Sequence, residues 1–369
     1  MFPHTSEIII IVLGVSGLIA GAMLLWKIRY CLDDIGDVAE STRATVIIPA
    51  RNEAGTLPEL LTSLKSQECN IEMLVVDDHS EDSTAEIAQS LGARVISSDP
   101  LPVGWSGKTW ACYQGAQHAS NEILIFLDAD TIVHPGGLKR MIATFNSELA
   151  VMSIAPFHIT KKLHEQFSAI FNMIVISSVN AFSAFSSHRT PSGLFGPCLM
   201  VKRSDYNRID GHSSVKSKIL ENLYMAEKFK EAGIPMTCFG GRGVLSYRMY
   251  PVSLKQLIEG WGKAFVSGAK QTEKFLTLLI SFWFAGLVSV PVYLLATALL
   301  PNISVSYVIL SLYFLYVIEQ IWALRRIGSF FLITGAFYPL TVFFSLGVFC
   351  YSFIKSIRGS GVQWKGRKI

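Results

Sequence analysis

The chain has 369 residues and a formal net charge of +4; 50% of its residues are hydrophobic and 16% are charged. Soluble domains are typically about a quarter charged, so this composition excludes an ordinary soluble protein along the whole length. The small net charge gives no support for binding to nucleic acid, and no nucleic-acid partner is expected.

The first segment is apolar and has no charged residue from Ile8 to Trp26, which is long enough to cross a bilayer as a helix. Ala20-Gly-Ala22 resembles the cleavage site of a signal peptide, which is the alternative interpretation. No Lys or Arg precedes the span, whereas Lys27 and Arg29 follow it. The sequence therefore predicts an uncleaved membrane anchor over residues 1–30, with the next domain in the cytoplasm.

Residues 44–265 have the composition of a globular domain, and strand and helix patterns alternate in its first part. Strands are expected at 45–48, 73–76, 93–96 and 123–127, and helices at 57–66, 84–91 and 110–119. This alternation predicts βαβ units with right-handed crossovers, and therefore an α/β fold with a parallel sheet.

Two carboxylates, Asp128 and Asp130, end the apolar run Ile123–Leu127. Side chains two residues apart leave a strand on the same side. The carboxyl edge of a parallel sheet is also where ligands bind in open α/β folds. Paired carboxylates there suit Mg²⁺ or Mn²⁺ shared with a diphosphate. The alternative is a strand followed by an acidic turn.

Other polar side chains are expected at the same edge of the sheet. Pro49, Arg51 and Glu53 follow the first strand, Asp77-Asp78 follow the second, and Gly107-Lys108 precede a helix. No Gly-x-Gly-x-x-Gly follows the first strand, and no Gly-x-x-x-x-Gly-Lys-Ser/Thr is present, so dinucleotide and P-loop sites lose their main support. Carboxylates at this edge fit recognition of a base and ribose through N–H and O–H groups.

In combination, these motifs resemble the family 2 glycosyltransferases over about residues 44–265. The resemblance implies a Rossmann-like nucleotide-sugar domain, here with transmembrane helices at both ends of the chain. It implies that Glu53 and Asp78 contact uridine, that Asp128 meets the ribose or the metal, and that Asp130 ligates the metal. The implied nucleotide-sugar set is Pro49, Arg51, Glu53, Asp77, Asp78, Lys108 and Asp128, with Lys108 also on the diphosphate.

Four stretches are similar to bacterial carotenoid-acid glycosyltransferases: Gly107–Gly115, Phe167–Asn172, Phe195-Gly196-Pro197 and Trp364–Arg367. This similarity implies inverting transfer of glucose from UDP-glucose to the carboxyl of a C30 carotenoid acid, forming a glucosyl ester. Related enzymes that act on a hydroxyl lipid (ceramide, hopanoid or diacylglycerol) are an alternative. A polysaccharide synthase would need a Gln-x-x-Arg-Trp segment and more helices. A non-enzymatic scaffold is also an alternative, but the intact Asp78, Asp128, Asp130 and Lys108 argue against it.

The residues Glu221-Asn222 differ from the family pattern. Family members normally end the acceptor region with Glu-Asp, and the Asp removes the proton of the acceptor. Asn222 stands at that position and cannot act as a base. Either Glu221 takes the role, or no base is needed, because a carboxylic acid with a pKa near 4 is about 99.9% ionised at pH 7. A third interpretation is that Glu221 only caps a helix.

A further group of residues is predicted to contact the acceptor or to close over the site. It consists of Phe195, Gly196, Arg248, Trp261, Lys263, Trp364 and Arg367. In the family, an Arg/Trp-rich segment at the position of Arg248, Trp261 and Lys263 closes over the diphosphate. The alternative for these residues, and for Trp364 and Arg367, is anchoring at the level of lipid headgroups.

The rest of the chain predicts a multi-pass protein of the cell membrane. Residues 166–185 are expected to form an interfacial helix, and 275–355 a transmembrane region that would admit a lipophilic acceptor from the bilayer. The basic tail 356–369 is expected in the cytoplasm. Three crossings after the anchor would leave this tail outside, unless a re-entrant segment near Gly335 and Pro339 changes the parity.

Overall fold

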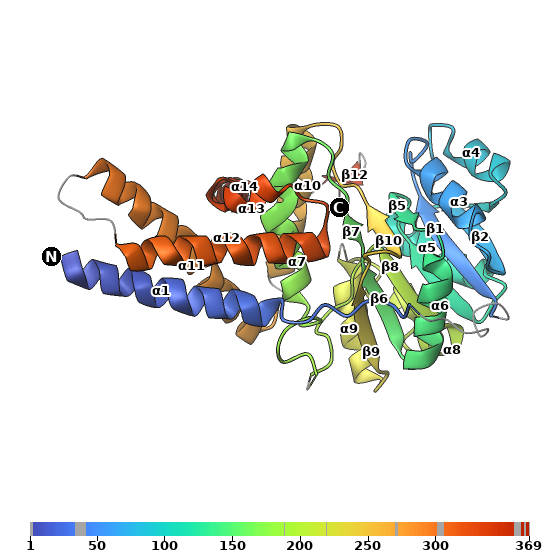
Figure 1. Cartoon of the computed structure of the whole chain (residues 1–369). Coiled ribbons are helices and arrows are strands. Elements are labelled where there is room, and N and C mark those ends of the chain that lie inside the picture. The colour runs from blue at the N-terminus through green and yellow to red at the C-terminus, as the bar shows by residue number, and fades with distance from the viewer. Residues whose placement is uncertain are drawn as a thin grey trace. The chain divides into compact units, whose positions relative to one another are not determined.

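The structure is a computed structural model that describes residues 3–33, 42–187, 189–218, 220–269, 272–300, 306–357, 363–364 and 367–368 (Figure 1). The chain forms two compact units. The helical unit comprises Met1–Ile28, Thr160–Arg189 and Tyr250–Ser360, and the sheet unit comprises Arg29–Ile159, Thr190–Met249 and Gly361–Ile369. The sequence-based domain 44–265 is one continuous stretch, whereas the sheet unit omits 160–189 and 250–265.

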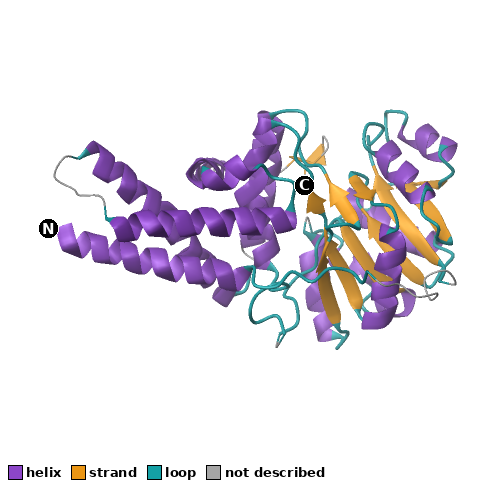
Figure 2. Ribbon diagram, viewed as in Figure 1, coloured by secondary structure: helices purple, strands orange, loops and turns teal. Residues whose placement is uncertain are grey.

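The sheet unit contains a seven-stranded sheet in the order β3-β2-β1-β4-β8-β6-β9 (Figure 2). Its strands are β1 (Ala44–Ala50), β2 (Ile71–Asp77), β3 (Arg94–Ser97), β4 (Ile123–Leu127), β6 (Val151–Ala155), β8 (Cys198–Lys202) and β9 (Met236–Gly240). The predicted strands pair in parallel, as expected. The sequence analysis did not predict β8, which pairs antiparallel with both β4 and β6. A second sheet joins β5 (Thr131–Val133), β10 (Leu245–Tyr247) and β7 (Phe157–His158).

The predicted alternation of strands and helices is confirmed in the first part of this unit. Helices α3 (Leu57–Lys65), α4 (Thr84–Ser90) and α5 (Gly107–His118) connect the first four strands, and α6 (Gly137–Glu148), α8 (Arg203–Arg208) and α9 (Glu221–Glu231) follow. Every residue of β4 is buried, which explains its continuous apolar run. The sheet therefore places the carboxyl ends of β1, β2 and β4 side by side.

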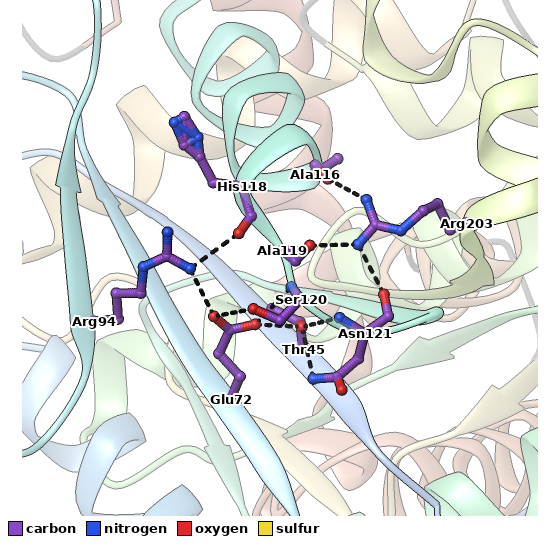
Figure 3. Close-up of polar contacts among 9 residues, drawn as sticks. All are labelled: Thr45, Glu72, Arg94, Ala116, His118, Ala119, Ser120, Asn121 and Arg203. Atoms are coloured by element: carbon purple, nitrogen blue, oxygen red, sulfur yellow. Dashed lines mark hydrogen bonds and ion pairs between the residues drawn. The ribbon is translucent and has the colours of Figure 1, made fainter.

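A polar network holds the C-terminal end of α5 at the amino ends of β1 and β2, on the side of the sheet away from their carboxyl ends (Figure 3). Arg203 donates hydrogen bonds to the carbonyl oxygens of Ala116, Ala119 and Asn121 at 2.7, 2.7 and 2.8 Å. These are carbonyls at and just beyond the helix end, where a cation is favourable. Glu72 accepts from the backbone N–H of Ser120 at 2.8 Å. Because Lys108 lies at the other end of α5, this network helps to set its position.

We expect Arg203→Ala to lower the free energy of unfolding by about 1–3 kcal/mol, because it leaves three partly buried carbonyl groups without this donor. Denaturation in detergent, followed by tryptophan fluorescence, measures the change. Lys202→Ala is the matched control, since Lys202 is the neighbouring exposed cation. Equal stability of the two variants would show that the network contributes nothing.

The helical unit contains α1 (Pro3–Leu24), α7 (Ala169–Ser178), α10 (Leu254–Ala269), α11 (Lys274–Leu299), α12 (Tyr307–Ile327), α13 (Leu332–Ala336) and α14 (Tyr338–Ile357). Four described helical stretches are long and apolar enough to cross a membrane: Thr5–Leu24, Lys274–Leu299, Tyr307–Ile327 and Tyr338–Lys355. Within this unit α1 and α12 run alongside one another, whereas α14 is seen along its axis and lies across them (Figure 1).

The predicted interfacial segment 166–185 folds as part of the helical unit. It begins within a 3₁₀ helix (Leu163–Ser168), continues as α7 and ends in turns. Gln166 accepts hydrogen bonds from the backbone N–H of Phe331 at 3.0 Å and from Thr334 Oγ1 at 2.7 Å. These bonds hold the short α13 in the connection between α12 and α14, near the predicted Gly335–Pro339 irregularity.

Candidate active site

A pocket opens in the sheet unit at the carboxyl ends of β1 and β4. Several elements that are distant in sequence meet there: the ends of two strands, the start of α5, the 195–197 loop, the 3₁₀ helix Gly211–Val215 and the start of α9. The residues that line the pocket are Pro49, Lys108, Cys112, Phe126, Leu127, Asp128, Gly196, His212, Glu221 and Asn222. The predicted catalytic residues Lys108, Glu221 and Asn222 therefore lie in one pocket with Pro49 and Asp128 of the predicted nucleotide-sugar set. The other predicted donor and metal residues do not line this pocket: Arg51, Glu53, Asp77, Asp78 and Asp130.

Lys108 lies between two carboxylates in this pocket. Its Nζ is 2.7 Å from Asp128 Oδ1 and 2.9 Å from Glu221 Oε1. Ser106 caps α5 by accepting from the backbone N–H of Thr109 at 3.3 Å, and so fixes the first turn that carries Lys108. Burial alone would lower the pKa of Lys108, but the two carboxylates outweigh it and raise the pKa well above its ordinary value. The lysine is a permanent positive charge in the site.

The two aspartates after β4 form an acidic cluster with Glu53. Burial, together with the nearby carboxylates of Asp128 and Glu53, raises the pKa of Asp130 from 3.8 to about 7. Among the described residues no three His, Cys, Asp or Glu side chains already surround one point as metal ligands. Two carboxylates nevertheless fit Mg²⁺ or Mn²⁺, which commonly take only one or two protein carboxylates and complete their shell with phosphate oxygens and water.

The loops after β1 and β2 are tied together, and this positions the residues predicted to contact the nucleotide. The backbone N–H of Asn52 donates to Ser80 Oγ at 3.0 Å, and Asn52 Oδ1 accepts from the N–H of Glu81 at 2.8 Å. Asn52 has a φ of 54°, a left-handed conformation that Asn tolerates better than most residues. Arg51 Nη1 donates to the carbonyl oxygen of Asp78 at 3.0 Å. Arg51, Glu53 and Asp78 are therefore held near one another.

Asp77 and Asp78 are both buried at the carboxyl end of β2. Asp77 Oδ2 accepts from the backbone N–H of Ser80 at 3.4 Å. The carboxylate of Asp78 lies 3.8 Å from Arg51 Nη1. Asp77 thus stabilises the turn after β2, and Asp78 is the member of the pair with a guanidinium beside its carboxylate.

Glu221 and Asn222 begin α9 and are both buried. Asn222 Nδ2 donates to the carbonyl oxygen of Gly196 at 3.2 Å and is 3.4 Å from Glu221 Oε1. Asn222 Oδ1 is buried and has no hydrogen-bond partner among the described residues. The glutamate is therefore engaged by Lys108 and Asn222. The asparagine lines the pocket and keeps one buried acceptor without a partner among the described residues.

The acceptor and closure candidates do not all come to the pocket. Gly196 lines it, whereas Phe195 is buried beside Ser153, whose Oγ accepts from the Phe195 N–H at 2.7 Å. Arg248 follows β10 in the sheet unit. Trp261 is buried in the helical unit, where its Nε1 donates to Ser168 Oγ at 3.0 Å.

Three candidates have no described side chain. Lys263 lies within α10, and Trp364 and Arg367 are paired residues of β11 (Gln363–Trp364) and β12 (Arg367–Lys368). Their predicted roles at the acceptor mouth stay predictions, and the placement of their side chains lies outside the described residues.

Sequence reasoning missed Cys112 and His212, which both line the pocket. Cys112 lies one turn after Lys108 on α5, so helical periodicity could have placed it there. His212 follows Asp210 and Gly211, whose φ values of 57° and 51° form a left-handed turn. The dipeptide Asp210-Gly211 is a turn signal in the sequence, but only the fold shows that this turn places His212 in the pocket.

Comparison with known proteins identifies the family of this chain. Residues 45–209 match the family model described as Glycosyl transferase family 2. The chain is 38% identical over 273 residues to the 4,4'-diaponeurosporenoate glycosyltransferase of Staphylococcus haemolyticus, covering 72% of this chain and 73% of that protein. The chain belongs to glycosyltransferase family 2. It is a glycosyltransferase, and the predicted fold class and family are confirmed.

Two further likenesses extend over more of this glycosyltransferase. The 4,4'-diaponeurosporenoate glycosyltransferase of Staphylococcus aureus is 33% identical over 328 residues, covering 88% of this chain and 87% of that protein. A mannosyltransferase of Pyrobaculum calidifontis, solved in complex with GDP-Man and Mn²⁺, has a TM-score of 0.54 at 17% identity and covers 91% of this chain and 99% of that one. This second likeness shows the fold.

Proposed function

We propose that this glycosyltransferase transfers glucose from UDP-glucose to the carboxyl of a C30 carotenoid acid, with inversion at the anomeric carbon. The observation that carries the proposal is Asn222 at the position where the family places an acidic base, in a chain similar to 4,4'-diaponeurosporenoate glycosyltransferases. The predicted acceptor needs no deprotonation, because its carboxylate is already formed at pH 7.

The donor end of the site has charges suited to a nucleoside diphosphate sugar. Asp78 would accept from the uracil N–H, Glu53 would contact the uridine, and Lys108 would face the diphosphate. Asp128 and Asp130 would hold Mg²⁺ or Mn²⁺, which supplies positive charge to the leaving diphosphate. The charge of Lys108 stabilises the departing UDP more strongly as negative charge builds up in the transition state.

The acceptor end of the site favours attack without a general base. Glu221 is paired with Lys108 at 2.9 Å, which commits one carboxylate oxygen to a cation. General-base help is worth about 10²–10⁴-fold for a protonated nucleophile. A carboxylate oxygen has no proton to lose and attacks directly, with bond formation at the anomeric carbon and departure of UDP.

The test uses the full-length enzyme in detergent with UDP-glucose and Mn²⁺. An apocarotenoid acid and a ceramide are offered separately, and the products are identified by mass spectrometry. A glucosyl ester from the acid and no product from the ceramide is the expected result. Glucosyl ceramide alone would retain the family, reject the carotenoid acceptor and make Glu221 the base to study.

We expect Asn222→Asp to lower kcat/KM with the acid acceptor by at least about tenfold. The new carboxylate would lie about 3.2 Å from the Gly196 carbonyl oxygen and beside Glu221, where like charges repel. It would also repel the anionic acceptor. Steady-state kinetics against wild type measure the change. A gain of activity would show that a base limits the reaction and would reject direct attack.

We propose a membrane topology with three crossings, α1, α11 and α12, and with α14 lying in the cytoplasmic interface. Because α14 lies across α1 and α12, these helices cannot all run perpendicular to the plane of one bilayer (Figure 1). Exposed apolar side chains along α13 and α14 fit burial in the headgroup region: Ile333, Phe337, Leu340, Phe343, Tyr351 and Ile354. This topology places the C-terminus and the sheet unit in the cytoplasm. A C-terminal reporter that is active only outside the cytoplasm would contradict it by giving a signal.

A further inference from the structure

His212 is held in one tautomer by Tyr206. The Tyr206 hydroxyl accepts from the backbone N–H of His212 at 3.1 Å and lies 2.9 Å from His212 Nδ1. Burial raises the pKa of Tyr206, so the hydroxyl keeps its proton. If His212 Nδ1 carried a proton, the buried tyrosine proton would have no acceptor among the described residues. Tyr206 therefore donates to Nδ1, and the remaining proton of the imidazole lies on Nε2.

The surroundings of His212 keep its imidazole neutral and rigid. Burial, with a smaller contribution from the Lys108 cation, lowers the pKa of His212 to about 3. The ring packs against Phe126, with centroids 4.9 Å apart. Gly211 allows this arrangement, since a Cβ at that position would lie 2.2 Å from the Tyr206 ring. His212 lines the pocket, and its Nε2 has no hydrogen bond to another described residue.

Two buried residues that line the pocket thus each have a polar side-chain atom without a partner among the described residues. His212 supplies Nε2–H, and Asn222 supplies Oδ1, which is buried without a partner. If the oxygen and nitrogen of the Asn222 amide exchanged places, the oxygen would face the Gly196 carbonyl oxygen and Glu221 Oε1, which are both acceptors. The nitrogen is therefore the atom that makes these contacts, and Oδ1 is the atom without a partner. A carboxylate can satisfy only the donor, whereas a hydroxyl can accept from Nε2–H and donate to Oδ1.

We propose that His212 and Asn222 form a subsite that recognises one hydroxyl group of the sugar carried by the nucleotide. This inference rests on the proposed function, in which the acceptor head is a carboxylate and the sugar is the source of hydroxyl groups. Loss of that hydroxyl leaves two buried polar groups unpaired, which is the strongest basis for rejecting an analogue. The subsite therefore contributes to selection of the sugar.

The test measures binding of donors to the full-length protein with Mn²⁺ and without acceptor, by isothermal titration calorimetry. The probes are UDP-glucose and its 2-, 3-, 4- and 6-deoxy analogues. We expect wild type to bind one analogue at least about tenfold more weakly than UDP-glucose. His212→Phe and Asn222→Ala should reduce that difference to less than about threefold, for this analogue alone. The amide of a glutamine can accept a hydrogen bond from Tyr206 and donate one to a ligand in the pocket. His212→Gln should therefore keep the tenfold difference in binding between UDP-glucose and this analogue.

The variants and outcomes separate binding from folding. His212→Phe leaves the proton of the Tyr206 hydroxyl without its acceptor, so the Tyr206→Phe/His212→Phe double variant is measured beside it, with thermal denaturation of each. Equal binding of all four analogues by wild type, or unchanged selectivity in His212→Phe and Asn222→Ala, would overturn the inference. Hydroxyl selectivity without a glucosyl ester product would instead reject the proposed acceptor and leave this subsite standing.

Discussion

Replacing Lys108 with methionine is expected to lower kcat/KM by about 10²–10³-fold, the range typical for loss of one preorganised charge at the reacting centre. Lys108 lies within 2.9 Å of both Asp128 and Glu221, and methionine keeps most of the volume but removes the charge. The variant removes the cation that Asp128 and Glu221 share. The two carboxylates then repel each other and the leaving diphosphate. Most of the loss should appear in kcat, because the charge acts most strongly in the transition state.

Steady-state kinetics with saturating Mn²⁺ check this expectation. Lys65→Met is the matched control, because Lys65 is an exposed lysine at the end of α3. Lys108→Arg keeps the charge in a larger group and should retain part of the activity. Activity of Lys108→Met within about threefold of wild type would contradict a role for Lys108 in stabilising the leaving group.

Asp130→Asn is expected to lower kcat/KM by about 10²-fold or more and to weaken Mn²⁺ binding, because it removes one of two predicted carboxylate ligands. In wild type the pKa of Asp130 is raised to about 7. Protons should therefore compete with the metal, and the dissociation constant for Mn²⁺ should rise as the pH falls below about 7. Steady-state kinetics measure the loss of kcat/KM, and titration calorimetry with Mn²⁺ between pH 6 and pH 8 measures the weaker binding and its pH dependence.

The same substitution has a predicted effect on stability without metal. Between about pH 4 and pH 7 the folded protein keeps a proton on Asp130 that the unfolded chain has released. The free energy of unfolding of wild type therefore falls as the pH rises through this range, and Asp130→Asn should lose that component. Glu81→Gln, at an exposed carboxylate, is the control. Equal pH profiles of stability for wild type and Asp130→Asn would show that the carboxyl group of Asp130 is not destabilised by its surroundings.

Local sequence patterns predicted the half of the sheet that positions the donor residues. The runs at 45–48, 73–76 and 123–127 are short, apolar and followed by polar residues, so they identify strands and their functional ends without knowledge of the fold. Lys108 was recognisable because it begins a helix between two such strands. These features depend on residues adjacent in sequence, and the structure places them as β1, β2, β4 and α5.

The other half of the site depends on contacts that sequence periodicity does not report. The antiparallel direction of β8 follows from its pairing with β4 and β6, which lie far away in the chain. The pairing of Glu221 with Lys108 joins residues more than 100 positions apart. His212 was not among the predicted site residues, because its contacts with Tyr206 and Phe126 and its place in the pocket depend on the fold.

Transfer to a carboxylate without a general base is the central step of the proposed reaction. The most direct measurement compares kcat/KM for two acceptors with the same polyene chain, one ending in a carboxylic acid and the other in a primary alcohol, with UDP-glucose and saturating Mn²⁺. We expect the acid to be preferred by at least about 10²-fold, since the alcohol lacks general-base help worth about 10²–10⁴-fold. Equal values, or a preference for the alcohol, would contradict it.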